Sequence, residues 1–359
     1  MKKLKQTFSL LALMAALLAL CSGATAEEAP AYGDLTGDGE ISAADAAAML
    51  RGIAFQQLSE EARPDLDFTK NGTIDATDAR AALFYACGGI EDMVAFGERV
   101  SGGLCPERLF DRFCYTGVRD DGSGNYRSEN VAVSITRGRF QTSNYTLADL
   151  YLQDISYLTT AFSNGTFGGG TNTVKKMFES VPDAVLALNG DFYSLHVYGP
   201  VIRNGVVYVD RVNRTWDIAL LLTNGELVTY DDRTLTKEAL LQMEVYQSWV
   251  FGPALLDAEG HAKEKFRSAV QPVNPRSVLG YYEPGHYAFL AVDGRAKKSK
   301  GLTMQELSQL CEELGFSRAY NLDGGQSSVL LAKNGVINHP VRNGRPISDI
   351  IAVRDPQPG

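Results

Sequence analysis

Two copies of one aspartate-rich pattern, beginning at Asp34 and at Asp67, constrain the fold of this chain more than any other feature of its sequence. Each copy places oxygen-bearing side chains at positions 1, 3, 5, 9 and 12, glycine at position 6 and isoleucine at position 8. Hard cations prefer oxygen ligands that alternate along a tightly turned loop, and glycine permits the turn. The repeat therefore predicts two small loops, each folded around a cation.

The spacing is that of an EF-hand calcium loop. Both copies end in aspartate, where an EF-hand ends in glutamate, and we expect no helix before the first loop. Alanine-rich helices are expected after the loops, at 44–51 and 77–86. Two calcium sites are predicted, with position 7 contributing its backbone carbonyl, and their ligands are Asp34, Thr36, Asp38, Glu40, Asp45, Asp67, Thr69, Asn71, Thr73 and Asp78.

The duplicated loop with a terminal aspartate resembles a type I dockerin over residues 31–89. The resemblance implies a small all-α calcium-binding module that docks onto a cohesin-bearing scaffold protein, as in a cellulosome. Residues 43–44 and 76–77 occupy the positions at which dockerins contact cohesin. A calcium-stabilised module without a partner is the alternative. The glycine-containing polar stretch at 90–103 is expected to be a linker.

The N-terminus has the three parts of a secretory signal peptide. Three lysines among the first five residues precede an apolar run at 8–20, and the small residues at 24–26 form a cleavage site. We therefore expect residues 1–26 to be removed and the protein to be secreted. Lipoprotein anchoring at Cys21 is the less favoured alternative, because a leucine precedes this cysteine where a small residue is required.

The composition is that of an ordinary globular protein, with 359 residues, 45% hydrophobic and 21% charged. Its net charge of −9 gives no support to a nucleic-acid partner or to attraction by an anionic membrane. No segment reaches the length of a transmembrane helix.

Four cysteines remain after the predicted cleavage, and an exported chain can join them in disulfides with three pairings. Cys105 and Cys114 are close enough in sequence to close a small loop. None has the spacing of a metal site, and a catalytic cysteine has no support. The four are Cys87, Cys105, Cys114 and Cys311.

The stretch 319–331 places a polar, glycine-rich centre between two apolar runs, which predicts a strand, a tight turn and a second strand. Asp323 follows the first run, and the paired Gly324 and Gly325 allow backbone N–H groups to converge on an anion. With Ser327 and Ser328, this stretch suits a polar or anionic substrate. The alternative is an Asp-Gly hairpin whose polar groups only satisfy the turn.

Three aspartates follow apolar strands in the same way: Asp191, Asp293 and Asp323. A helical stripe at 303–314 separates the last two strands, which suggests a β-α-β unit with both aspartates at one sheet edge. Arg276 and Arg295 lie near such strand ends. Carboxylates act as acid or base and arginine suits phosphate, so the group suggests hydrolysis of a phosphate-bearing glycan. Turn formation and structural ion pairs are the alternatives.

Ordered sequence blocks across residues 130–355 resemble the phosphodiester glycosidase family. Gln326 replaces a glycine common in that family, and 95–130 matches no motif that we can name. The resemblance implies a mixed α/β or α+β catalytic domain at 104–356. The blocks are NGDFY (189–193), GPVIRNG (199–205), FGPAL (251–255), NPRSVLG (274–280), HY (286–287), VDGR with SKGLT (292–303), AYNLDGGQSS (319–328), VINHP (336–340) and RPISDI (345–350).

The resemblance implies cleavage of the glycosidic bond of a sugar-1-phosphodiester. It places catalytic roles on Asp323, Asp293 and Asp191. Two other functions remain open: a non-catalytic glycan-binding protein, and a phosphodiesterase that cuts the P–O bond. A metal in this region is also left open. The substrate-binding residues implied are Asn189, Arg276, Arg295, Asn321, Gly324, Gly325, Ser327 and Ser328.

Overall fold

The computed structural model describes residues 33–70, 72–194, 199–212, 215–231 and 233–356. The predicted signal peptide and Cys21 lie outside these ranges. The chain divides into two compact units, Met1–Ser101 and Gly102–Gly359, which we describe separately. Among the described residues, no helix has both the length and the apolar character needed to cross a bilayer.

The first unit is helical, as predicted for the duplicated loops. Each loop leads into its helix through a capping box, in which Ser42 or Asp75 caps the helix and Asp45 or Asp78 reaches back to the cap. The aspartate that closes each predicted calcium loop therefore lies in the first turn of the helix that follows. The helices are α2 (Ala43–Ala54), η1 (Pro64–Leu66), α3 (Ala76–Ala86) and α4 (Met93–Ser101).

Residues 90–103, expected to form a linker, instead contain α4. Phe96 is buried, and its ring meets that of Phe84 edge-on with 5.7 Å between the centroids. Gly97 lies so close to the backbone that an added Cβ would fall 2.1 Å from the carbonyl oxygen of Phe68. The helix is thus part of the core of the first unit. It contains too few apolar residues for a helical periodicity to be recognised in the sequence.

In the described part of the second unit there are four sheets, and their neighbouring strands are antiparallel. In spatial order, the seven-stranded sheet contains β1 (Arg119–Asp120), β2 (Tyr126–Arg127), β3 (Val131–Phe140), β4 (Ser143–Leu152), β13 (His286–Val292), β12 (Arg276–Glu283) and β14 (Arg318–Asn321). The five-stranded sheet contains β16 (Gly335–Val336), β15 (Leu330–Ala332), β6 (Ala184–Asn189), β17 (Asp349–Arg354) and β5 (Leu158–Phe162).

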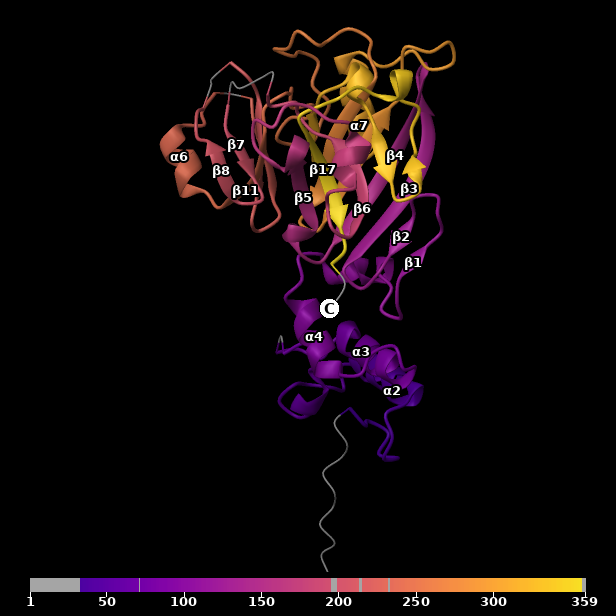
Figure 1. The fold of residues 1–359 in the computed structure, drawn as a ribbon. Helices are drawn as coiled ribbons and strands as arrows, with labels where there is room; N and C mark the ends of the chain where they lie inside the picture. The colour runs from indigo at the N-terminus through magenta and orange to yellow at the C-terminus, as the bar shows by residue number, and fades with distance from the viewer. Residues whose placement is uncertain (1–32, 71, 195–198, 213–214, 232, 357–359) are drawn as a thin grey trace, which may run out of the picture. The chain divides into compact units, whose positions relative to one another are not determined.

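Two smaller sheets and α6 form a group at one side of the unit (Figure 1). Their strands are β10 (Leu227–Tyr230), β9 (Ile218–Leu222) and β11 (Val245–Trp249) in one sheet, and β7 (Val201–Arg203) and β8 (Val206–Val209) in the other. The helical segments of the unit are η2 (Glu107–Arg112), η3 (Ile155–Tyr157), η4 (Ser163–Gly165), α5 (Val174–Phe178), α6 (Lys237–Gln242), α7 (Met304–Glu313), η5 (Gly325–Ser327) and η6 (Val341–Asn343).

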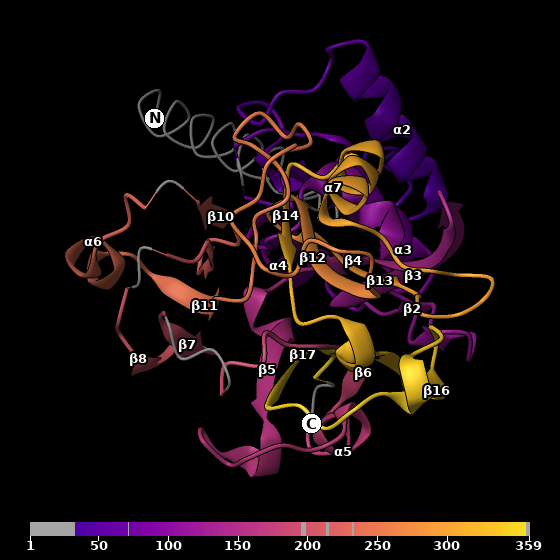
Figure 2. The same cartoon turned by 90° about the horizontal axis from the view of Figure 1, so that it is seen from above.

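The two large sheets pack face to face between α7 and α5 (Figure 2). The buried residues of strand β13 explain this arrangement, because successive side chains point to opposite faces of the sheet. Phe289 faces the other sheet, whereas Leu290 faces α7. In β17, Ile351 faces the seven-stranded sheet and Ile350 faces α5. A sheet with apolar side chains on both faces must be packed against another element on each side. The result is four layers: α7, the seven-stranded sheet, the five-stranded sheet and α5.

The predicted α+β fold class is confirmed. The predicted helix at 303–314 corresponds to α7. An Asn204-Gly205 turn joins β7 to β8 with positive φ at both residues. The four cysteines after residue 26 are free thiols, so the loop between Cys105 and Cys114 is not closed by a disulfide.

Phe289→Ala is expected to lower the free energy of unfolding of the second unit by about 3–5 kcal/mol, because it leaves a cavity between the two large sheets. Both tryptophans, Trp216 and Trp249, lie in this unit, so fluorescence during urea unfolding reports it alone. The exposed Val336→Ala variant is the control and is expected to change stability by less than about 0.5 kcal/mol. Equal effects of the two substitutions would contradict the proposed core.

Candidate active site

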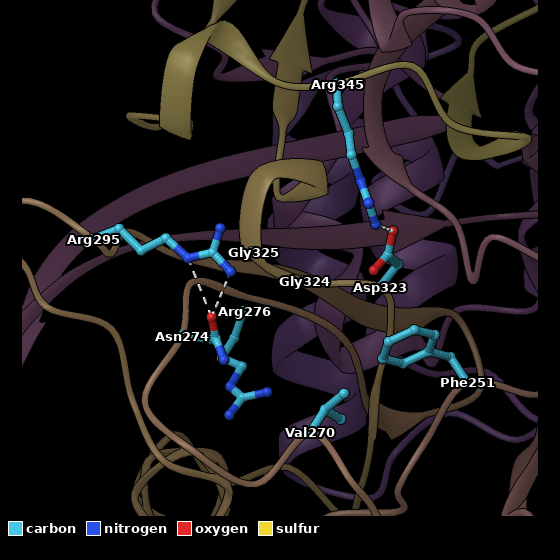
Figure 3. Close-up of a pocket in the computed structure, with 9 residues that line it drawn as sticks. All are labelled: Phe251, Val270, Asn274, Arg276, Arg295, Asp323, Gly324, Gly325 and Arg345. Carbon is cyan, nitrogen blue, oxygen red and sulfur yellow. Dashed lines mark hydrogen bonds and ion pairs between the residues drawn. The ribbon is translucent and has the colours of Figure 1, made fainter.

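One pocket gathers polar side chains at the sheet edge where β12 begins and where β13 and β14 end (Figure 3). Antiparallel pairing of β12 with both neighbours brings these three ends together. Asp293 and Asp323 therefore follow strands that end at the same edge, as the sequence predicts. The pocket has a volume of about 190 Å³ and is lined by Phe251, Val270, Asn274, Arg276, Arg295, Asp323, Gly324, Gly325 and Arg345.

The chain leaves one large sheet and enters the other at Asp323. Strand β14 belongs to the seven-stranded sheet, and β15 belongs to the five-stranded sheet. The predicted order of strand, turn and strand is confirmed, but the two strands do not pair with each other. The Asp-Gly hairpin alternative is therefore wrong. The loop between the sheets faces the pocket through Asp323, Gly324 and Gly325.

Asp323 is the carboxylate that the pocket offers. Nη2 of Arg345 donates to its Oδ2 at 2.8 Å, and Nε of the same arginine donates to Oγ of Ser327 at 2.6 Å. Oδ1 accepts no hydrogen bond from the described residues, although the residue is only 5% exposed. One oxygen of Asp323 is therefore held and the other remains available to a ligand.

Arg345 was not predicted as a site residue, although it begins one of the quoted family blocks. Its guanidinium lies 5.0 Å from the centre of the Phe192 ring, which adds a cation–π contact to the ion pair with Asp323. Figure 3 shows its side chain pointing at Asp323. In the sequence, the only indication of its role was an arginine 20 residues after Gly325.

Arg276 is buried and, in the described part of the chain, has no carboxylate partner. Its Nε donates to the carbonyl oxygen of Leu302 at 3.0 Å, and its Nη2 donates to that of Pro272 at 2.6 Å. Burial lowers the pKa of Arg276 to about 10, because the charged form is poorly solvated. An anion in the pocket would supply the missing opposite charge.

Arg295 approaches the pocket from the loop after β13. Its Nε and Nη2 donate to Oδ1 of Asn274 at 3.2 and 2.8 Å. Its backbone has φ of +55°, a left-handed conformation that is uncommon for arginine. The pocket thus combines three guanidinium groups with one carboxylate, so its lining favours an anionic ligand.

Both predicted glycines line the pocket, and neighbouring groups lie too close to them for a side chain to fit. A Cβ on Gly324 would lie 2.7 Å from the carbonyl oxygen of Pro275, and one on Gly325 would lie 2.9 Å from Nη2 of Arg295. The expectation that both amides converge on an anion fails for Gly325. Its N–H donates to the Pro275 carbonyl oxygen at 2.9 Å.

Asp293 lies near the pocket, but both of its carboxylate oxygens are occupied by His339. Oδ1 accepts from the His339 backbone N–H at 2.8 Å, and Oδ2 lies 3.1 Å from Nδ1 of its ring. The His339 side chain is 85% exposed. The group that this pair presents to solvent is therefore the imidazole, which was not predicted as a site residue.

Several other predicted residues hold the loop without lining the pocket. Nδ2 of Asn189 donates to the carbonyl oxygen of Asp323 at 2.6 Å, and its Oδ1 accepts from Oγ of Ser277 at 2.7 Å. Nδ2 of Asn321 donates to the carbonyl oxygen of Gly252 at 2.7 Å. Ser328 is buried, and its carbonyl oxygen accepts from Asn338.

The first predicted calcium loop brings three carboxylates together. Ligand atoms of Asp34, Asp38 and Asp45 all lie within 4.8 Å of one another. Loop N–H groups orient them: that of Gly39 donates to Asp34 at 2.8 Å, and that of Thr36 donates to Asp45 at 2.9 Å. Converging carboxylate oxygens on a loop tightened by glycine fit calcium.

The second loop repeats these contacts. The N–H of Gly72 donates to Asp67 at 2.9 Å, and that of Thr69 donates to Asp78 at 3.0 Å. Asn71, predicted at position 5, lies outside the described residues. The two loops are thus alike at positions 1, 3, 6 and 12. Glu40 and Thr73 occupy position 7, where the backbone carbonyl is the expected ligand.

Two family models match the chain. Residues 182–354, which include every residue that lines the pocket, match that of the phosphodiester glycosidases. Residues 32–81 match that of the type I dockerin domain. By these matches, residues 182–354 are similar to a phosphodiester glycosidase domain and residues 32–81 to a type I dockerin domain, and we call the two regions the glycosidase domain and the dockerin domain. Both resemblances found in the sequence are confirmed.

A solved structure shares the fold of the glycosidase domain. The zebrafish N-acetylglucosamine-1-phosphodiester alpha-N-acetylglucosaminidase catalytic domain, auto-inhibited by its pro-peptide, aligns with a TM-score of 0.52 and 16% identity. The alignment covers 63% of this chain and 83% of that one. At this identity the likeness shows the α+β fold.

A curated relative is the SPbeta prophage-derived uncharacterized protein YomE of Bacillus subtilis (strain 168), which is 26% identical over 163 residues. The matched part is 44% of this chain and 25% of the relative. The chain therefore spans only a quarter of that relative's length.

Asp191 lies in the glycosidase domain but away from the pocket lining. Its Oδ1 accepts from Nη2 of the buried Arg203 at 2.9 Å, and its Oδ2 accepts from the N–H of Val250 at 2.9 Å. The same Nη2 donates to Oδ2 of Asp349 at 3.0 Å. Two buried carboxylates thus share one guanidinium. Burial, together with the charge of Asp191, raises the pKa of Asp349 to about 7.

This cluster predicts a pH-dependent stability. With a raised pKa, Asp349 holds a proton in the folded state from about pH 4 to 7 that it has lost in the unfolded state. Its contribution to the free energy of unfolding is therefore fully present below about pH 4 and is lost as pH rises through about 7. Asp349→Asn is expected to flatten this fall, measured by urea unfolding from pH 5 to 8. Parallel slopes for wild type and variant would contradict the assignment.

Proposed function

We propose that this chain is a secreted hydrolase that cleaves the glycosidic C–O bond of a sugar-1-phosphodiester. The observation that carries the proposal is the pocket, whose described lining combines Arg276, Arg295 and Arg345 with one carboxylate, that of Asp323. Such a lining suits a phosphate group beside a reacting carbon. The match of this region to the phosphodiester glycosidase model supports the same reaction class.

In the proposed reaction, Oδ1 of Asp323 takes a proton from a water molecule whose oxygen attacks the anomeric carbon. The bond between that carbon and the phosphate oxygen breaks, and its electron pair stays on the phosphate. Free sugar and a phosphomonoester result. The three arginines stabilise the negative charge that grows on the leaving phosphate.

Asp293 is proposed to act through His339, because both of its oxygens contact that residue. An imidazole held by a carboxylate can transfer a proton to or from a reacting group. Asp191 is proposed to stabilise the domain, since Arg203 and Val250 occupy its oxygens. Asn189 and Asn321 are proposed to hold the loop in place, with no contact to substrate.

Asp323→Asn is expected to lower the release of sugar by a factor of at least about 100, because the amide cannot accept the proton. The substrate is an N-acetylglucosamine-1-phospho-sugar diester, chosen because the zebrafish enzyme of the same fold is named for that bond. Asp111→Asn, on the surface of η2, is the matched control and should be unaffected. Near-normal turnover by Asp323→Asn would remove this carboxylate from the mechanism.

The same assay in ¹⁸O-labelled water distinguishes the proposal from its alternatives. Cleavage of the C–O bond puts the label in the sugar, whereas a phosphodiesterase that cuts the P–O bond puts it in the phosphate. Binding of the diester without turnover, by a folded wild type, would favour the non-catalytic glycan-binding protein.

We also propose that the dockerin domain binds two calcium ions and docks onto a cohesin-bearing scaffold protein. The clustered carboxylates of the first loop and the matching contacts of the second support this. The module has few core residues of its own, so calcium binding is coupled to its folding. Residues 43–44 and 76–77 remain the predicted cohesin contacts.

Calorimetric titration of the full chain is expected to show two bound calcium ions. Asp45→Asn should lose one ion and the double variant with Asp78→Asn should lose both, because each removes the carboxylate that closes a loop. Asp65→Asn, which pairs with Arg63 outside both loops, is the control. One ion bound by wild type would restrict calcium to a single loop.

A further inference from the structure

Positive charge gathers beside the pocket in a chain whose net charge is −9. The segments 294–305 and 338–348 contain no aspartate or glutamate. Both reach the pocket, the first through Arg295 and the second through Arg345. Their lysines and arginines are Arg295, Lys297, Lys298, Lys300, Arg342 and Arg345.

A second cavity of about 650 Å³ lies between these two segments and shares Arg295 with the pocket. Arg342 and His339 also line it. Arg342 is exposed and forms no ion pair with any residue in the described ranges. Two guanidinium groups and an imidazole therefore line a space adjoining the pocket, and none of the described residues that line it is acidic.

Contacts on both sides hold this second cavity in shape. Nε2 of Gln326, in the glycine loop, donates to the carbonyl oxygen of Gly344 at 3.0 Å, which ties η5 to the end of η6. Asp293 fixes His339 through two contacts. The wall that carries Arg342 is thus attached to the loop that carries Asp323.

We propose that the second cavity binds a further anionic group of the substrate, so that the enzyme prefers glycans in which the sugar-1-phosphodiester repeats. The inference rests on the proposed function and specifies its substrate class. Each added phosphodiester brings one negative charge, and a local basic patch concentrates a polyanion that the rest of the chain repels. The described residues of the cavity lining include no phenylalanine, tyrosine or tryptophan on which nucleic-acid bases would stack, so a glycan is favoured over a nucleic acid.

The test compares kcat/KM for two probes with the same linkage, a single N-acetylglucosamine-1-phospho-sugar diester and an oligomer containing three such diesters. The oligomer should be preferred about tenfold per reactive bond at low salt, and the preference should vanish near 0.5 M salt. Arg342→Gln should remove the preference and leave the single diester unaffected. Lys175→Gln, an exposed lysine on α5, is the control.

Equal kcat/KM values for the two probes, or equal losses on both in Arg342→Gln, would overturn the inference. If neither probe is cleaved, the proposed reaction fails, and binding to Asp323→Asn then tests the cavity separately. Oligomer binding that depends on Arg342 would support the anion site without the reaction. Equal competition by single-stranded DNA of matched charge would overturn the assignment to a glycan.

Discussion

The amide of Asn189 joins the two large sheets at the point on which the pocket depends. It lies at the end of β6, where it donates to the carbonyl oxygen of Asp323 and accepts from Ser277 on β12. The chain crosses between the sheets here, so its backbone groups lose the regular partners that a strand provides. A buried side chain with both a donor and an acceptor satisfies them. Without it, the carbonyl oxygen of Asp323 would lose this buried hydrogen bond at the point where the loop crosses.

Two Asn-x-Asp patterns in the sequence acquire different environments in the structure. Asn189-Gly190-Asp191 and Asn321-Leu322-Asp323 each follow a buried strand, and both aspartates were predicted to be catalytic. Asp191 meets Arg203, which is 1% exposed, whereas Asp323 meets Arg345, whose side chain is 39% exposed. The pattern identifies a carboxylate after a strand. Which arginine reaches it depends on tertiary packing, which local sequence does not specify.

The same limit explains what else the sequence predicted and what it missed. Arg276, Arg295 and the glycines lie within or next to strands whose ends were predictable, so they were assigned to the site. Arg345 and His339 reach it from a segment with little regular structure, where no periodicity indicates direction. Helix α4 was missed for a similar reason. Its packing against Phe68 depends on Gly97, which in sequence is typical of a linker.

Charge distribution connects the two roles proposed for this chain. In the glycosidase domain, the buried Arg276 has no carboxylate partner among the described residues, so folding leaves its charge for a ligand to compensate. In the dockerin domain, clustered carboxylates leave the opposite charge for a cation. The glycosidase domain has a core of its own, so chelating calcium should abolish docking and leave hydrolysis by the second unit intact. If chelation also stopped hydrolysis, a metal would be required in the glycosidase domain itself.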